Sequence, residues 1–139
     1  MGLSIGETHW AYGGFADFRR RLAFEEDINL DDMAGFEREV FPGGGEWVGK
    51  ALPWHNDAGE PITVLEPLLN HSDCGGELTW EQCDQVVDRL EEIVQGWEMD
   101  SLNKYGSVEW IVGEYVRRGE DMVEEMRKCI ANKESLEFA

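Results

Sequence analysis

One stretch limits the fold more than any other, because an apolar residue recurs every three or four positions between residues 80 and 97. The members of this stripe are Trp80, Cys83, Val87, Leu90, Val94 and Trp97. Their spacing keeps them on one face of an α-helix. Thr79 precedes the stripe and Gln82 follows three residues later, which is the spacing of a capping box. The sequence therefore predicts a long amphipathic helix that starts near Trp80.

The stripe faces either the interior of the molecule or a second copy of the chain. A chain of 139 residues has the size of one domain and needs a core of its own. We therefore expect the stripe to face the core of a single domain that spans residues 1–139. A seam between two copies, and with it a homo-oligomer, is the alternative.

Helical spacing recurs before and after this stripe. A helix over about residues 15–26 is predicted from the mixed helical spacing of Phe15, Phe18, Leu22 and Phe24, and one of the aspartates at 31–32 is expected to begin a short helix. A last helical segment is expected to start near residue 102. Its stripe consists of Val108, Ile111, Tyr115, Met122, Met126 and Cys129, with Gly113 and Gly119 expected to bend or divide it.

The rest of the chain is irregular or short. Residues 42–61 are dense in Gly, Pro and Asn and hold two Trp, so a long loop is expected there. Leu136 and Phe138 near the C-terminus are expected to dock onto the body. The predicted fold is mainly α, a compact domain of about four to five helices with a long Gly/Pro/Trp loop. An α-dominated α+β fold with a small sheet is the alternative.

Charge is the strongest signal in the composition. Twelve Lys and Arg against thirty Asp and Glu give a net charge of -18, which repels nucleic acids and anionic membranes. We therefore expect no direct nucleic-acid binding and no membrane binding. The acidic surface either keeps the chain soluble or imitates nucleic acid toward a host protein. Without a leader-like start, and with an odd number of cysteines, the chain is expected to be cytoplasmic.

The segment "LLNHSDCGGELTWEQC" gathers His71, Asp73, Cys74 and Glu77 just before the capped helix. As a calcium loop it lacks the acidic ligands, and as a zinc site it offers one cluster where two spaced pairs are usual. The residue types also suit a thiolate, a base and an orienting acid, although residues so close in a turn rarely meet in that geometry. The structural alternative is a tight turn followed by a helix cap.

A basic and aromatic cluster near the N-terminus stands out from the acidic background. Arg19, Arg20 and Arg21 follow the aromatic residues Trp10, Tyr12, Phe15 and Phe18. In one interpretation, aromatic faces stack a base and Arg holds a phosphate, with Trp47, Trp54 and His55 lining the same pocket. In the other, the Phe residues belong to the core and the arginines neutralise acidic neighbours such as Glu25 and Glu26.

Three motifs in order resemble a family of small uncharacterised proteins from bacteria and their phages. These are "WAYGGFADFRRRLA", "LLNHSDCGGELTWEQC" and the terminal "SLEF". The family pattern has a Tyr-Gly/Ser-Phe-x-x-Phe-Arg opening and a His-Ser-Asp-Cys-Asp-Gly-Glu centre, and Gly75 departs from it by replacing the Asp. The resemblance implies a phage or prophage context, in which small proteins neutralise host defences. It implies no mechanism.

These observations predict a non-enzymatic cytoplasmic binding protein that sequesters a small nucleotide-like or phosphorylated ligand. The ligand-binding residues are predicted to be Trp10, Tyr12, Arg19, Arg20, His71, Asp73 and Glu77. No catalytic residue, metal site or cofactor is predicted. The first alternative is an acidic inhibitor, or nucleic-acid mimic, that blocks a host protein. The second is a small enzyme that uses His71, Asp73 and Cys74.

Overall fold

The computed structural model describes residues 2–34, 52–71, 75–105 and 110–139. The chain begins with two strands, β1 (Gly2–Ile5) and β2 (Thr8–Ala11), followed by helix α1 (Tyr12–Glu25) and a 3-10 turn, η1 (Leu30–Asp32). Helix α2 (Glu66–Leu69) and strand β3 (Gly76–Leu78) lead to two long helices, α3 (Trp80–Tyr105) and α4 (Trp110–Asn132). Strand β4 (Leu136–Phe138) follows α4.

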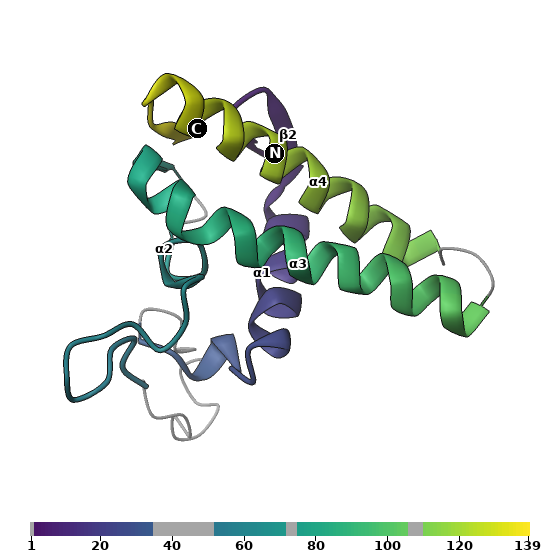
Figure 1. Ribbon diagram of the computed structural model, residues 1–139, viewed down its shortest axis with the longest axis horizontal. Coiled ribbons are helices and arrows are strands. Elements are labelled where there is room, and N and C mark those ends of the chain that lie inside the picture. Colours follow the sequence, from purple (N-terminus) through teal and green to yellow (C-terminus); the bar gives the residue numbers. More distant parts are fainter. Residues whose placement is uncertain (1, 35–51, 72–74, 106–109) are drawn as a thin grey trace, which may run out of the picture.

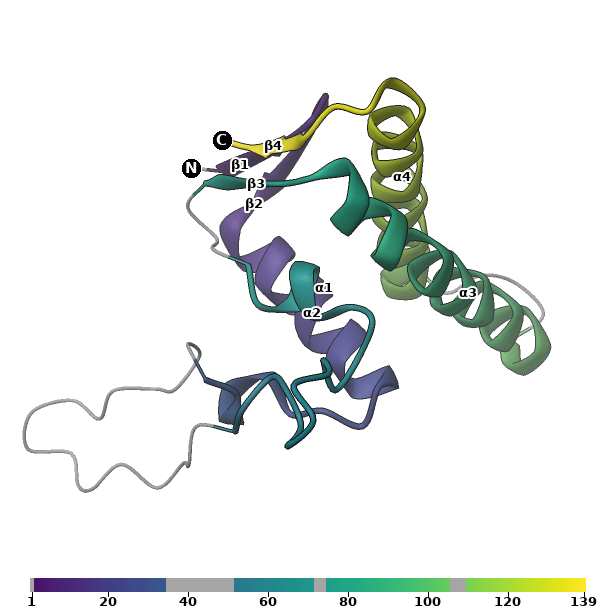
Figure 2. The same ribbon diagram turned by 60° about the vertical axis from the view of Figure 1, so that its left-hand side comes forward.

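The four strands form one antiparallel sheet with the order β2-β1-β4-β3. Strand β4 pairs with β1 at Ile5 and Phe138, and with β3 at Leu78 and Leu136. The two ends of the described chain therefore lie next to each other in the sheet (Figure 2). Helices α3 and α4 run side by side as a long hairpin, while α1 and α2 lie on another side of α3 (Figure 1).

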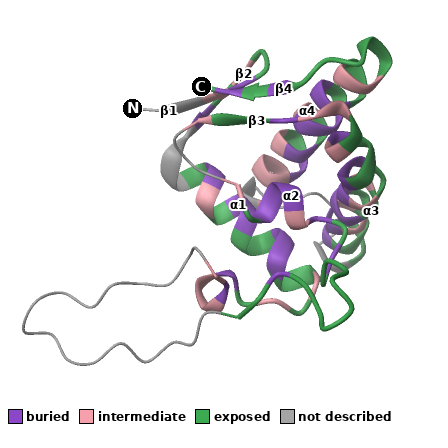
Figure 3. Cartoon of the chain, turned by 90° about the vertical axis from the view of Figure 1, so that its left-hand side faces the viewer, coloured by how far each residue is buried: buried purple, intermediate pink, exposed green. Residues whose placement is uncertain are grey.

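A single cluster of buried side chains joins these elements. Phe15, Phe18 and Leu22 of α1 are all fully buried, and Phe18 lies 6.0 Å from Trp97 of α3 between ring centroids. Buried residues lie where the helices face one another, and exposed residues cover their outer sides (Figure 3). The sheet contributes Ile5, and Phe138 of β4 is 2% exposed.

The helix predicted near Trp80 is confirmed, and so is its cap. The Thr79 hydroxyl accepts a hydrogen bond from the Gln82 N–H at 3.2 Å, and the Gln82 side chain accepts one from the Thr79 N–H at 2.9 Å. Every member of the stripe from Cys83 to Trp97 is at most 5% exposed. The stripe therefore faces the core of this chain.

The mainly-α prediction holds only in its coarse form. Helices dominate the described residues, but a four-stranded sheet accompanies them, as the α+β alternative proposed. The prediction favoured helices because each strand has only three or four residues, which is too short for a readable alternation. The docking of Leu136 and Phe138 is confirmed, since both are at most 2% exposed.

Several helix boundaries differ from the prediction. Helix α3 continues to Tyr105, so the residues near 102 belong to it and α4 begins only at Trp110. Helix α4 also runs undivided to Asn132, through both of its glycines. The short helix is a 3-10 turn capped by Asn29, whose side chain accepts a hydrogen bond from the Asp31 N–H. Of the predicted long loop, residues 52–61 are described and irregular, and residues 42–51 lie outside the described residues.

Candidate functional site

The basic and aromatic cluster near the N-terminus lies largely inside the molecule. Trp10 is 2% exposed and packs edge-on against Phe15 and Phe18, with centroid distances of 5.8 and 5.2 Å. Its indole N–H donates to the Thr8 hydroxyl at 3.0 Å. Trp10 is therefore a core residue, and its hydrogen-bond donor is already used within the chain.

Arg19 is buried as well, at 1% exposed. Its guanidinium donates hydrogen bonds to the main-chain carbonyls of Leu69, at 3.3 Å, and His71, and lies 4.5 Å from the Phe15 ring centroid. Burial, together with the neighbouring charge of Arg20, lowers the pKa of Arg19 to about 10. The side chain ties α1 to the segment that follows α2.

His71 and Glu77 lie in the same region. The His71 ring lies 4.0 Å from the Phe138 ring centroid, and its Nε2 is 3.3 Å from the Glu77 carbonyl oxygen. Gly76 adopts a φ of 108°, and a Cβ there would meet the His71 ring at 3.3 Å, so a side chain would be both strained and crowded. His71 thus links three parts of this region: its carbonyl accepts from Arg19, its ring packs on Phe138, and its Nε2 approaches the Glu77 backbone, while the Glu77 side chain is exposed.

Of the remaining predicted site residues, only Arg20 has a side chain within the described structure. Arg20 is exposed and pairs with Asp17 at 3.2 Å and Asp31 at 3.4 Å. The Tyr12 backbone begins α1, and its side chain lies outside the description. Asp73 also lies outside the described residues, as do Cys74 of the enzyme alternative and Trp47.

Of the long-loop residues assigned to the pocket, Trp54 and His55 are described, and each has its own local contacts. Trp54 is buried at 5% exposed, and its indole N–H donates to the Ala34 carbonyl at 2.9 Å. His55 is exposed and forms an isolated bridge to Pro61. Among the described residues, no group of three or more His, Cys, Asp or Glu side chains is arranged to hold a metal ion.

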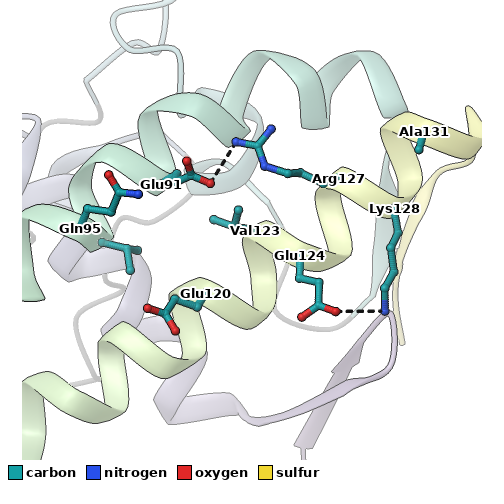
Figure 4. Close-up of a pocket in the computed structure, with 9 residues that line it drawn as sticks. Glu91, Gln95, Glu120, Val123, Glu124, Arg127, Lys128 and Ala131 are labelled. Carbon is teal, nitrogen blue, oxygen red and sulfur yellow. Dashed lines mark hydrogen bonds and ion pairs between the residues drawn. The ribbon is translucent and has the colours of Figure 1, made fainter.

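A different site lies on the outer side of the α3–α4 hairpin, as a groove of about 610 Å³ (Figure 4). Helix α3 contributes Glu91, Val94 and Gln95. Helix α4 contributes Glu120, Val123, Glu124, Arg127, Lys128 and Ala131. We call this the hairpin groove. Its apolar lining comes from both helices, and its rim carries charges of both signs.

Close contact between the two helices sets one wall of the hairpin groove. Gly119 is opposite Val94, and a Cβ on Gly119 would lie 2.3 Å from Val94 Cγ2. A side chain at Gly119 would therefore require the Val94 side chain or one of the helices to shift. Glu120 and Val123 of the lining follow directly after this contact along α4.

Ion pairs cross or border the hairpin groove. Arg127 reaches from α4 to Glu91 of α3 at 3.0 Å, and its guanidinium lies 3.6 Å from Asp88 (Figure 4). The hydrogen bond to Glu91 is the main cause that raises the pKa of Arg127 above its ordinary value. Lys128 lies 3.7 Å from both Glu124 and Glu125, and these carboxylates raise its pKa, Glu125 most strongly.

The helices that form the hairpin groove differ in charge. Helix α3 carries seven acidic and two basic residues, whereas α4 carries five acidic and four basic residues. Helix α1 has two acidic and three basic residues, and Arg19 among them is buried. Much of the negative charge is therefore on the hairpin and in the segments between α1 and α3.

The sequence pattern did not reveal the hairpin groove, although part of its signal was present. Val94 belongs to the predicted stripe of α3, but Val123 of α4 was absent from the second predicted stripe. The groove becomes visible only when the relative rotation of the two helices is known. Exposed Glu and Arg on its rim look like any solvated helix face.

Comparison with protein-family models, curated proteins and solved structures finds no match for this chain. In the described parts of the chain, no helix has the length and apolar character needed to cross a membrane.

Proposed function

We propose that this chain is a non-enzymatic binding protein that blocks a basic partner protein through the outer face of its α3–α4 hairpin. The observation that carries the proposal is a groove whose floor includes Val94 and Val123, set beside α3, a helix with seven acidic and two basic residues. Apolar area supplies affinity, and the surrounding carboxylates attract and orient a cationic partner.

The buried basic cluster gives less support to the sequestration of a phosphorylated ligand. A phosphate on Arg19 would displace the carbonyls of Leu69 and His71 from a side chain that is 1% exposed. Arg20 is accessible, but it is shared by Asp17 and Asp31. Nucleotide sequestration stays a prediction, and the experiment below detects it.

The resemblance to small phage and bacterial proteins is consistent with an inhibitor. A protein that neutralises a host factor needs a surface but no reaction centre. Many host factors that handle nucleic acids are basic, and the carboxylates of the hairpin are chemically suited to such a surface.

The test is affinity capture from a bacterial extract at about 50 and about 500 mM salt, because screening weakens exposed charge pairs. The bait is the whole chain, compared with the doubly reversed variant Asp84→Lys/Asp88→Lys. Both residues are exposed on α3. The control variant is Asp57→Lys/Glu60→Lys, which makes the same charge change in an exposed loop.

A basic protein that binds wild type and the control, fails to bind the α3 variant, and rebinds as a purified component supports the proposal. Native mass spectrometry of the purified chain is run in parallel. A stoichiometric nucleotide-sized molecule, released on denaturation, with no salt-sensitive protein partner, would overturn the proposal in favour of sequestration.

A further inference from the structure

The geometry points to an amphipathic α-helix of the partner as the occupant of the hairpin groove, and we propose this mode of recognition. The apolar face of that helix lies on the groove lining, and its flanking Lys or Arg side chains pair with Glu120, Glu124 and Glu91. The inference rests on the proposed function, since it specifies how the same surface recognises its partner.

The shape of the site suits a helix. The hairpin groove lies between two helices packed side by side, and a third helix can lie along such a groove with residues at i, i+3, i+4 and i+7 as anchors. The apolar part of the lining consists of exposed Ala131 and the edges of Val94 and Val123, which are 2% and 8% exposed. A volume of about 610 Å³ holds several aliphatic side chains, which matches one face of a helix rather than a single residue.

Two exposed apolar residues lie beyond the groove along α3. Met99 and Leu102 are large apolar residues that are 56% and 40% exposed. They follow Glu91 and Gln95 at steps of four, four and three residues, which places all four on one side of the helix. The distance from Glu91 to Leu102 along the axis is about 16 Å, or roughly three turns of a bound helix.

Charge selects among the occupants that this shape allows. Helix α3 carries seven acidic and two basic residues, so a second copy of the chain that packed along α3 would bring like charges together. A nucleic acid is disfavoured for the same reason. A basic amphipathic helix has the opposite sign and the required apolar face.

The existing ion pairs define where the partner's charges bind. Glu91 and Glu124 are each held by a basic residue of α4, and the side chains of Arg127 and Lys128 are about half exposed. Exposed pairs of this kind contribute little stability and rearrange easily. An incoming Lys or Arg can share these carboxylates, while Glu120 is exposed on the same rim.

The test uses three synthetic peptides of about 18 residues, a length that spans five helical turns. The first peptide has Leu at helical spacing on one face and Lys on the flanks. The second keeps the Leu face and replaces each Lys by Glu. The third keeps every Lys and replaces each Leu by Ser. Binding to the whole chain is measured by fluorescence anisotropy, and peptide helicity is measured by circular dichroism.

The first peptide is expected to bind and gain helicity, and the other two are expected to bind at least tenfold more weakly. Glu120→Lys/Glu124→Lys should weaken the first peptide by at least tenfold, and Leu102→Asn should weaken it by about threefold. All three substituted residues are exposed, so these variants keep the core. The control variant Asp57→Lys/Glu60→Lys should bind as the wild type does.

Binding of the first peptide that is unaffected by the groove variants would overturn the inference, as would failure to bind at about 100 µM. If a basic partner is still captured through Asp84 and Asp88, the proposed function stands and only the helix-in-groove mode fails. If no partner is captured and the peptide does not bind, both fail.

Discussion

Arginine has opposite roles in two regions of this molecule. In the region where α1 meets the segment after α2, Arg19 is 1% exposed and donates to main-chain carbonyls. On the hairpin, the Arg127 side chain is 47% exposed and pairs with Glu91 across a groove. The first arginine stabilises the fold, whereas the second leaves a charged surface that a partner can reach.

The comparison shows that a basic residue beside aromatic rings is weak support for a ligand site until its burial is known. The pKa of Arg19 is lowered because burial disfavours its charge, and that of Arg127 is raised because Glu91 accepts its hydrogen bond. A side chain whose donors serve buried carbonyls is costly to redirect to a ligand.

Removing the buried arginine should have the largest effect. Arg19→Ala leaves the carbonyls of Leu69 and His71 without this donor and creates space beside Phe15, so we expect a loss of about 2–4 kcal/mol of unfolding free energy. Arg20→Ala should change it by at most about 0.5 kcal/mol, because its ion pairs are exposed. Urea denaturation followed by Trp fluorescence measures both. Equal losses of unfolding free energy in the two variants would show that the buried arginine stabilises the fold no more than the exposed one.

The contact that sets the wall of the hairpin groove should be the next most sensitive. Gly119→Ala places a methyl group against the stiff Val94 side chain and should cost about 1–3 kcal/mol. Gly96→Ala in α3 is the matched control, since its Cβ meets no atom within 4 Å. It should stabilise the chain by roughly 0.5–1 kcal/mol. Thermal unfolding shows whether each substitution stabilises or destabilises the chain. Stabilisation by Gly119→Ala would mean that α3 and α4 are farther apart at this point than the structure shows.

The buried thiol of Cys83 should make the unfolding free energy of the chain fall at alkaline pH. The effect comes from the single proton of this thiol. Burial, with a smaller effect of Cys129, raises the pKa of Cys83 from 9.0 to about 12. Between these values the unfolded chain loses this proton and the folded chain keeps it, so stability falls as pH rises from about 9 to about 12. Cys83→Ala should flatten the decline measured by urea denaturation at successive pH values. An unchanged slope would show that other groups cause it.

The smallest effect is expected for Arg127, the exposed arginine of the hairpin. Arg127→Ala removes an ion pair in which both side chains are at least 40% exposed, so unfolding free energy should change by at most about 0.5 kcal/mol. Urea denaturation of this variant is compared with that of Arg19→Ala. A loss above about 1.5 kcal/mol would show that the bridge over the groove is structural.

The sequence predicted those parts of the fold in which local chemistry and packing agree. The stripe from Cys83 to Trp97 and the cap at Thr79 follow from periodicity and hydrogen-bonding capacity alone. The strands were largely missed because three or four residues carry little pattern, and because β4 completes its pairing only with β1 and β3. Such pairing depends on contacts far apart in the chain.

The candidate site was less predictable than the fold. Arg19 and Trp10 were predicted to line a ligand pocket because of their residue types. Their burial, however, depends on how α1 packs against the core. The hairpin groove depends on how α3 and α4 are rotated against each other, and Gly119 and Val94 are one point at which they meet closely. The spacing of apolar residues in the sequence does not predict the rotation of one helix against another to the accuracy that a site requires.

The position of β4 between β1 and β3 has a consequence for biosynthesis. Strands β1 and β2 leave the ribosome first, whereas the strand that joins them to β3 is made more than a hundred residues later. Until residues 136–138 emerge, Ile5 and Leu78 lack their neighbours on β4. The hairpin of β1 and β2 must therefore wait for more than a hundred further residues before the sheet closes, and a chain stalled before β4 would expose two unpaired strand edges to other proteins.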